Sequence, residues 1–71
     1  MDRISFDKYV AQRLAGTIQV CGGRALTQPA LDAWCEALSD FDVNETCEML
    51  SEWPRYHKTA PTPYDLAKEM T

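Results

Sequence analysis

The chain has 71 residues and a formal net charge of −4, and 45% of its residues are hydrophobic. This length excludes a second domain, and the composition excludes a disordered chain. So short a chain has a small core, which predicts that it dimerises or binds a partner, and its negative charge argues against unspecific attraction to nucleic-acid phosphates.

The first expected helix runs from Ser5 to Cys21. Ser5 can cap its start, and Gly22 and Gly23 can adopt the left-handed conformation that ends helices. Its apolar residues recur at four-residue steps, which is helical spacing: Phe6, Val10, Leu14 and Ile18.

The second expected helix follows Thr27, which is a good N-cap residue. Pro29 falls in its first turn, where a missing N–H is tolerated. Ser39 and Asp40 compete for backbone hydrogen bonds and end the helix. Its apolar stripe contains Leu31, Trp34, Cys35 and Leu38.

The third expected helix begins at Asp42 or Asn44, either of which can act as the cap. We expect it to end at Trp53, because Pro54 disfavours helical conformation in the residue before it. Its apolar face contains Val43, Thr46, Cys47, Leu50 and Trp53. Both tryptophans of the chain therefore lie on apolar stripes and are expected in the core.

The last expected helix follows two closely spaced prolines in the segment "TAPTPYDL". Thr62 is the expected cap, Pro63 takes the first helical position, and Asp65 lies three residues after the cap. The expected apolar residues are Tyr64, Leu66, Ala67 and Met70. The sequence thus predicts an all-α fold, a small bundle of about four short helices that forms one domain over residues 1–71.

Acidic residues dominate the middle of the chain. Between Arg24 and Arg55 there are seven acids and no lysine or arginine: Asp32, Glu36, Asp40, Asp42, Glu45, Glu48 and Glu52. Carboxylates at helical spacing can be the solvated faces of amphipathic helices, a metal or acid–base pair, or a surface for a basic partner. We predict a protein-binding site that contains Asp32, Glu36, Glu45, Glu48, Glu52, Arg55, Tyr56 and Tyr64.

Four residues could in principle bind zinc or act in catalysis: Cys21, Cys35, Cys47 and His57. They lie 14, 12 and 10 residues apart, whereas structural zinc sites usually take paired ligands from one tight turn. Cys35 and Cys47 also lie on the apolar stripes of their helices, which favours buried, inert cysteines in the reduced state. No nucleophile turn accompanies His57, so we expect no enzyme activity, no catalytic residue, no metal and no cofactor.

The chain lacks a signal-peptide core and any apolar run long enough to span a bilayer. We therefore expect no membrane contact and a cytoplasmic location, which is the host cytoplasm if a phage encodes the chain. Apolar surface left outside the stripes, at Tyr9, Phe41 or Met49, is surface that a homodimer could cover.

From Leu26 to its end, about two thirds of its length, the chain resembles the phage replicative helicase loader and inhibitor family. The likeness lies in "WCEAL", then a break and an amphipathic helix, then "APTPYDLAKEM". The matching positions are Trp34, Leu38, Pro61, Pro63, Asp65 and Leu66. The resemblance implies a small all-α domain that binds the replicative helicase. Loaders continue into a further segment that contacts the helicase, whereas this chain stops at Thr71, so it implies an organising module or a relative with another partner.

Three functions follow in order of preference. The first is a small phage or mobile-element protein that binds and modulates a protein of a nucleic-acid machine in DNA replication, as a loader-like adaptor or an inhibitor, without catalysis. The second is a phage-encoded inhibitor of a host defence or regulatory protein that acts through an acidic helical face. The third is a small DNA-binding domain that uses Arg3, Lys8, Arg13, Arg24, Arg55 and Lys58, and a site for single-stranded nucleic acid at Arg55, Tyr56 and Lys58 is its most local form.

Overall fold

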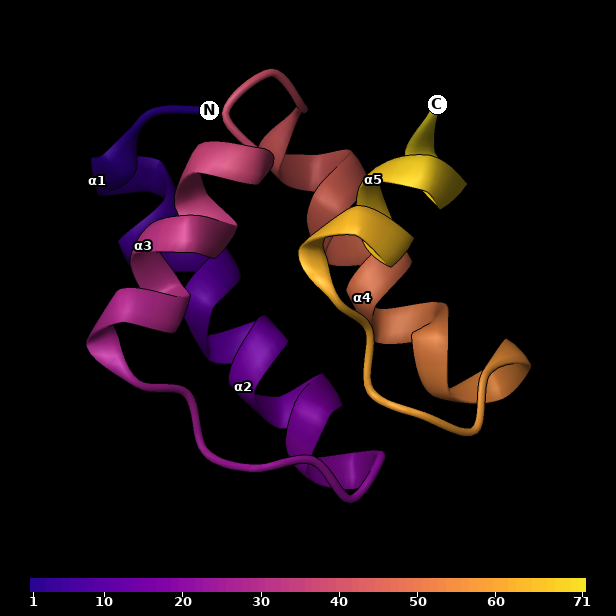
Figure 1. Ribbon diagram of the computed structural model, residues 1–71. Helices are drawn as coiled ribbons and strands as arrows, with labels where there is room; N and C mark the ends of the chain where they lie inside the picture. The colour runs from indigo at the N-terminus through magenta and orange to yellow at the C-terminus, as the bar shows by residue number, and fades with distance from the viewer.

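A computed structural model describes all 71 residues. The chain is 70% helical, has no strands and folds as one small globule of four helices (Figure 1). The first helix has three consecutive segments, α1 (Arg3–Ser5), the π-helical η1 (Phe6–Val10) and α2 (Ala11–Val20). It is followed by α3 (Gln28–Ala37), α4 (Val43–Tyr56) and α5 (Pro63–Met70). The predicted all-α bundle of about four short helices is confirmed.

The first helix begins earlier than predicted. Asp2 is its N-cap and accepts a hydrogen bond of 2.8 Å from the backbone N–H of Ser5, so the prediction that Ser5 caps the helix is wrong. In η1 the N–H of Ala11 donates to the carbonyl of Phe6, five residues back. A π turn holds more residues than an α turn, which keeps side chains four residues apart nearer to one line along the helix. The whole predicted stripe from Phe6 to Ile18 is buried.

The predicted caps of the other helices are confirmed. Thr27 accepts from the N–H of Ala30 at the start of α3, and Asp42, rather than Asn44, accepts from the N–H of Glu45 in α4. At the start of α5, Thr62 and Asp65 each accept from the other's backbone N–H, which is a capping box. These local bonds fix where each helix begins, and so which residues share a face.

The predicted end of α4 at Trp53 is wrong, because the helix continues through Pro54 to Tyr56. Pro54 has no N–H for the carbonyl of Leu50, four residues back. The hydroxyl of Thr17 on α2 supplies the missing donor, at 2.8 Å. A contact between two helices therefore satisfies the carbonyl that the proline leaves without its helical donor.

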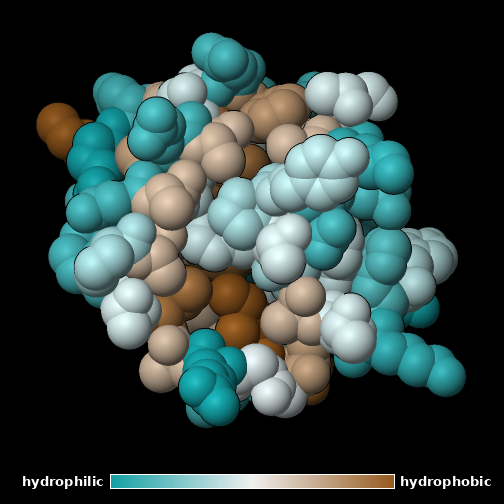
Figure 2. Space-filling view, viewed as in Figure 1, coloured by the Kyte–Doolittle hydropathy of each residue, from teal (hydrophilic) through white to brown (hydrophobic).

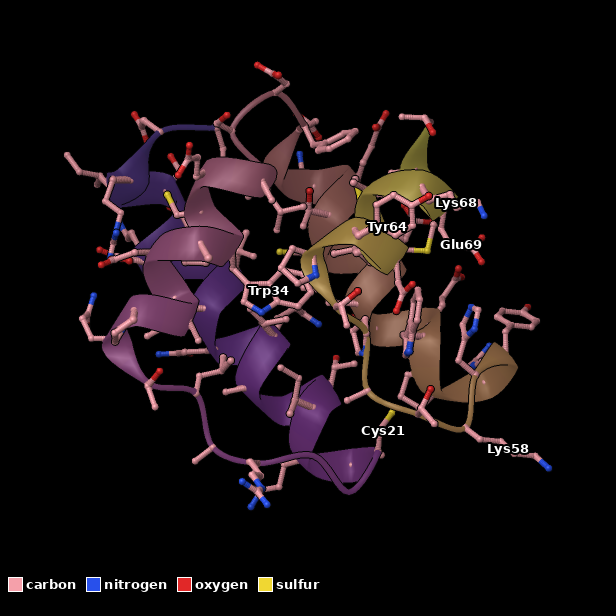
Figure 3. The ribbon with its side chains drawn as sticks, in the orientation of Figure 1. Cys21, Trp34, Lys58, Tyr64, Lys68 and Glu69 are labelled. Atoms are coloured by element: carbon pink, nitrogen blue, oxygen red, sulfur yellow. The ribbon has the colours of Figure 1, made fainter.

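The core lies where the first helix meets α4, with α5 packed on α3 and α4. Trp34 and Trp53 are each 4% exposed, which confirms their predicted place in the core. Figure 3 shows Trp34 pointing from α3 toward the middle of the bundle. The buried apolar residues are Phe6, Val10, Leu14, Ile18, Trp34, Leu38, Leu50, Trp53 and Leu66. None of the helices is both long and apolar enough to cross a membrane.

Candidate protein-binding site

Three predicted acids share the exposed face of α4. The cap at Asp42 sets the register of the helix, which buries Thr46, Leu50 and Trp53 and leaves Glu45, Glu48 and Glu52 in solvent. Their spacing of three and four residues places the three carboxylates along one side. This is the part of the predicted site that the fold brings together.

Helix α5 supplies the other wall of a shallow groove beside these acids. The groove has a volume of about 270 Å³ and is lined by Glu45, Glu48, Met49, Glu52, Glu69 and Met70. We call it the acidic groove. Met49 and Met70 are partly buried and pack against the core. Sequence patterns alone did not assign Met49, Glu69 or Met70 to the site. Met70 belongs to the predicted apolar stripe of the last helix, and Glu69 is the exposed residue before it.

No lysine or arginine forms an ion pair with the carboxylates of the acidic groove. Glu45, Glu48 and Glu52 form no ion pair, and Glu69 lies 3.5 Å from Nε2 of His57, a pair that is ionic only when the imidazole is protonated. Hydrophilic side chains cover the edge of the molecule beside α5 (right-hand side of Figure 2). The groove therefore combines an apolar floor with four uncompensated or weakly compensated negative charges.

The predicted acids of α3 lie outside the acidic groove. Asp32 accepts hydrogen bonds from Arg3 at 2.7 Å and from Gln28 at 3.1 Å, and these bonds, chiefly that from Arg3, lower the pKa of Asp32. Arg3 also contacts Asp7 at 3.0 Å. Glu36 is exposed and has no ion-pair partner. Asp32 is thus a partner of the first helix, and Glu36 is an unpaired acid outside the acidic groove.

The remaining predicted site residues are exposed but do not line the acidic groove. Tyr56 is 74% exposed and Tyr64 is 72% exposed. Arg55 lies in the last turn of α4, where a cation suits the helix dipole. Figure 3 shows Tyr64 on α5, on the same helix as Lys68 and Glu69. The acidic groove itself does not depend on these residues.

Aromatic contacts hold the connection between α4 and α5. The ring of His57 stacks on Trp53, with centroids 3.7 Å apart and an interplanar angle of 16°. The indole N–H of Trp53 donates to the carbonyl of Thr59 at 2.9 Å. Since His57 also reaches Glu69 on α5, this small cluster ties the two walls of the acidic groove together.

The three cysteines are free and only partly buried, so the expectation that they are buried is too strong. Cys47 contacts the carbonyl of Tyr9 through its sulfur at 3.6 Å, and Cys21 lies at the end of α2 (Figure 3). No group of three or more His, Cys, Asp or Glu residues is placed to hold a metal ion.

The basic residues contact different elements. Arg3 is bound to Asp7 and Asp32, whereas Arg13 on α2 donates to the hydroxyl of Ser51 on α4 at 2.8 Å. Lys58 points outward from the connection after α4 (Figure 3). Arg24 lies on the loop after α2, so these four cations come from α1, α2 and two loops.

The largest hollow of the molecule lies between α2, the loop after it and α3. It has a volume of about 490 Å³ and a mainly apolar lining of Ala11, Gln12, Ala15, Gln19, Gly23, Arg24, Ala25, Leu26 and Leu31. Figure 2 shows apolar atoms on the floor of a hollow over this region, below the centre of the view. Arg24 is its one charged residue, so it has the opposite charge to the acidic groove.

No model of a known protein family, no curated protein and no solved structure matches the chain.

Proposed function

We propose that the chain is a small phage or mobile-element protein that binds and modulates a protein of a nucleic-acid machine in the host cytoplasm, without catalysing a reaction. The observation that carries the proposal is the row of exposed glutamates on α4 that form no ion pair. Like charges at helical spacing repel each other, which weakens the free protein slightly. A partner with complementary charge relieves this repulsion, so the negative charge of the row favours a basic partner.

The distribution of the basic residues favours a protein partner over a nucleic acid. Binding to nucleic acid needs several cations that converge on one strip of backbone phosphates. Here Arg3 forms ion pairs with two aspartates and Arg13 donates a hydrogen bond to a serine of α4, so both cations already have partners within the chain. The open acidic groove, in turn, repels phosphates.

A protein that handles nucleic acid is a suitable partner because its own binding channel is basic. An acidic helical protein can occupy such a channel or dock at its edge. Occupation makes it an inhibitor, and docking beside the channel makes it an adaptor that recruits the enzyme. The resemblance to helicase loaders, carried by Trp34 and the capped helix α5, favours a replicative helicase as the partner. The inhibitor form applies equally to a host defence or regulatory protein.

The test begins with capture of partners by the tagged chain from a lysate of the host, treated with nuclease and washed at moderate salt. Captured proteins are identified by mass spectrometry, purified, and assayed for unwinding or cleavage with and without the chain. One stoichiometric nucleic-acid enzyme whose activity changes supports the proposal. A bait that retains only nucleic acid when nuclease is omitted, with retention that weakens steeply as salt rises, overturns it in favour of DNA binding.

A further inference from the structure

We infer that the acidic groove binds an amphipathic helix of the partner, which inserts one apolar side chain between Met49 and Met70 and places lysine or arginine side chains against the surrounding glutamates. This inference rests on the proposed function and adds to it the surface that makes the contact and the chemistry of the segment that it takes.

The size of the acidic groove favours a side chain over a small molecule. Its volume of about 270 Å³ lies below the roughly 300–1,000 Å³ of pockets that bury a small ligand. The groove also opens between two helices rather than into the core. It is therefore suited to one or two side chains from a larger surface that lies across it.

The floor of the groove provides an adaptable apolar contact. Met49 and Met70 are unbranched, so they can change rotamer to fit different apolar partners. Both lean on the core and are only partly exposed. An apolar anchor from the partner would bury the remaining exposed part of the two side chains, and such central anchors supply most of the affinity of protein contacts.

The charges around the floor match the spacing of a helix. Glu45 and Glu52 are seven residues apart on α4, a rise of about 10 Å, and Glu48 lies between them. Glu69 stands on the opposite wall, on α5. A partner helix with cations three, four and seven residues apart places them along the same line. Complementary charge of this kind sets the orientation and the rate of association.

A second copy of the chain fits the groove poorly. Each copy has eleven acidic residues against seven lysines and arginines, so two copies repel each other. The charge of the groove thus indicates a different, basic protein.

The direct test uses a fluorescent helical peptide of about 15 residues, with a central leucine and lysines three and four residues to either side of it. Its affinity is measured by anisotropy, and its site by amide chemical-shift changes in the labelled protein. We expect binding that shifts amides of α4 and α5 around Met49 and Met70. Replacing the central leucine of the peptide by serine should weaken binding by about fivefold or more.

Two protein variants with the same change of charge locate the contact. The double variant Glu48→Gln/Glu52→Gln removes two charges from the acidic groove, and Glu36→Gln/Asp40→Asn removes two charges outside it. Neither touches a buried residue. We expect about tenfold weaker peptide binding for the groove variant and less than about twofold for the control. Equal losses in both variants, or no binding of the peptide to the parent, overturn the inference.

The same two variants separate this inference from the proposed function. If the parent and the Glu36→Gln/Asp40→Asn control capture the partner from lysate and the groove variant does not, the inference is supported. If all three capture it equally, the partner uses another surface, so the inference fails while the proposed function stands. If the parent captures no nucleic-acid enzyme, the proposed function fails, whatever the peptide does.

Discussion

The hydroxyl of Thr17 on α2 donates a hydrogen bond of 2.8 Å to the backbone carbonyl of Leu50 on α4. Pro54 leaves this carbonyl without its helical donor, since proline has no N–H. Thr17 is 7% exposed and Leu50 is fully buried, so water does not take the donor's place. One side chain therefore satisfies a buried carbonyl and joins α2 to α4.

Thr17→Val should lower the free energy of unfolding by about 1–3 kcal/mol. Valine has nearly the shape of threonine but leaves the buried carbonyl of Leu50 without a donor. Urea denaturation of the parent and the variant measures the difference. The matched background is Pro54→Ala, because alanine has the backbone N–H that proline lacks. There the penalty of Thr17→Val should shrink by about 1 kcal/mol or more. An equal penalty with and without Pro54 would show that the two sites are not linked.

Gly23→Ala and Gly16→Ala should change stability in opposite directions. A Cβ at Gly23 would lie 2.5 Å from Cγ2 of Ile18 and 3.1 Å from Cβ of Ala60, so we expect a loss of about 1–3 kcal/mol. A Cβ at Gly16 meets no atom within 4 Å inside α2, so we expect a gain of about 0.5–1 kcal/mol from helix propensity. Thermal melts followed by circular dichroism measure both. A stabilising Gly23→Ala would contradict the close packing of this loop on α2.

Acid should weaken the fold in part through Asp32 and Asp2. Hydrogen bonds from Arg3 and then Gln28 hold the pKa of Asp32 below its ordinary value of 3.8, and the backbone N–H of Ser5 does the same for Asp2. A carboxylate with a depressed pKa in the folded state stabilises the protein above the unfolded pKa of about 3.9. That contribution is lost as the pH falls through the folded pKa.

Asp32→Asn isolates this pH dependence. The variant should melt at a lower temperature than the parent near neutral pH, and the gap should close as the pH falls below about 4. Melting temperatures measured from about pH 6 to pH 2 test this. Asp2→Asn should show the same convergence with a smaller gap at neutral pH, because asparagine also caps helices. A gap that stays constant over the whole range would exclude a titrating carboxylate as the cause.

His57→Ala should destabilise the end of α4 and the connection that follows it. The substitution removes the stack on Trp53, and such aromatic pairs contribute about 0.5–1.5 kcal/mol. His57→Phe keeps a ring on Trp53 and loses only the contact to Glu69, so its stability should stay close to that of the parent. Hydrogen exchange of the amides at the end of α4 and in the connection, residues 55–60, gives a local measure. The control is Lys58→Ala, next to His57 and exposed, and if it has the same effect as His57→Ala, the stack is not the cause.

The N-caps of three helices depend only on residues that are close together in the sequence. Thr27, Asp42 and Thr62 each accept a hydrogen bond from the backbone three residues on, so the residues that decide the start of the helix are all close in sequence. The same locality placed Glu45, Glu48 and Glu52 on one exposed face, because helical period alone determines which residues of α4 point the same way. Helix number, most helix starts and the acids of α4 therefore follow from the sequence.

The tertiary structure decided what depends on residues far apart in the chain. Helix α4 continues past Pro54 because Thr17, 37 positions earlier, supplies the hydrogen bond that local rules count as lost. Asp32 leaves the acidic surface because Arg3 reaches it from the first helix. Glu69 and Met70 join the acids of α4 only because Leu66 docks α5 on the core beside them. The sequence determined the helices and their faces, and the packing of those faces decided which charges are neutralised and which remain open to a partner.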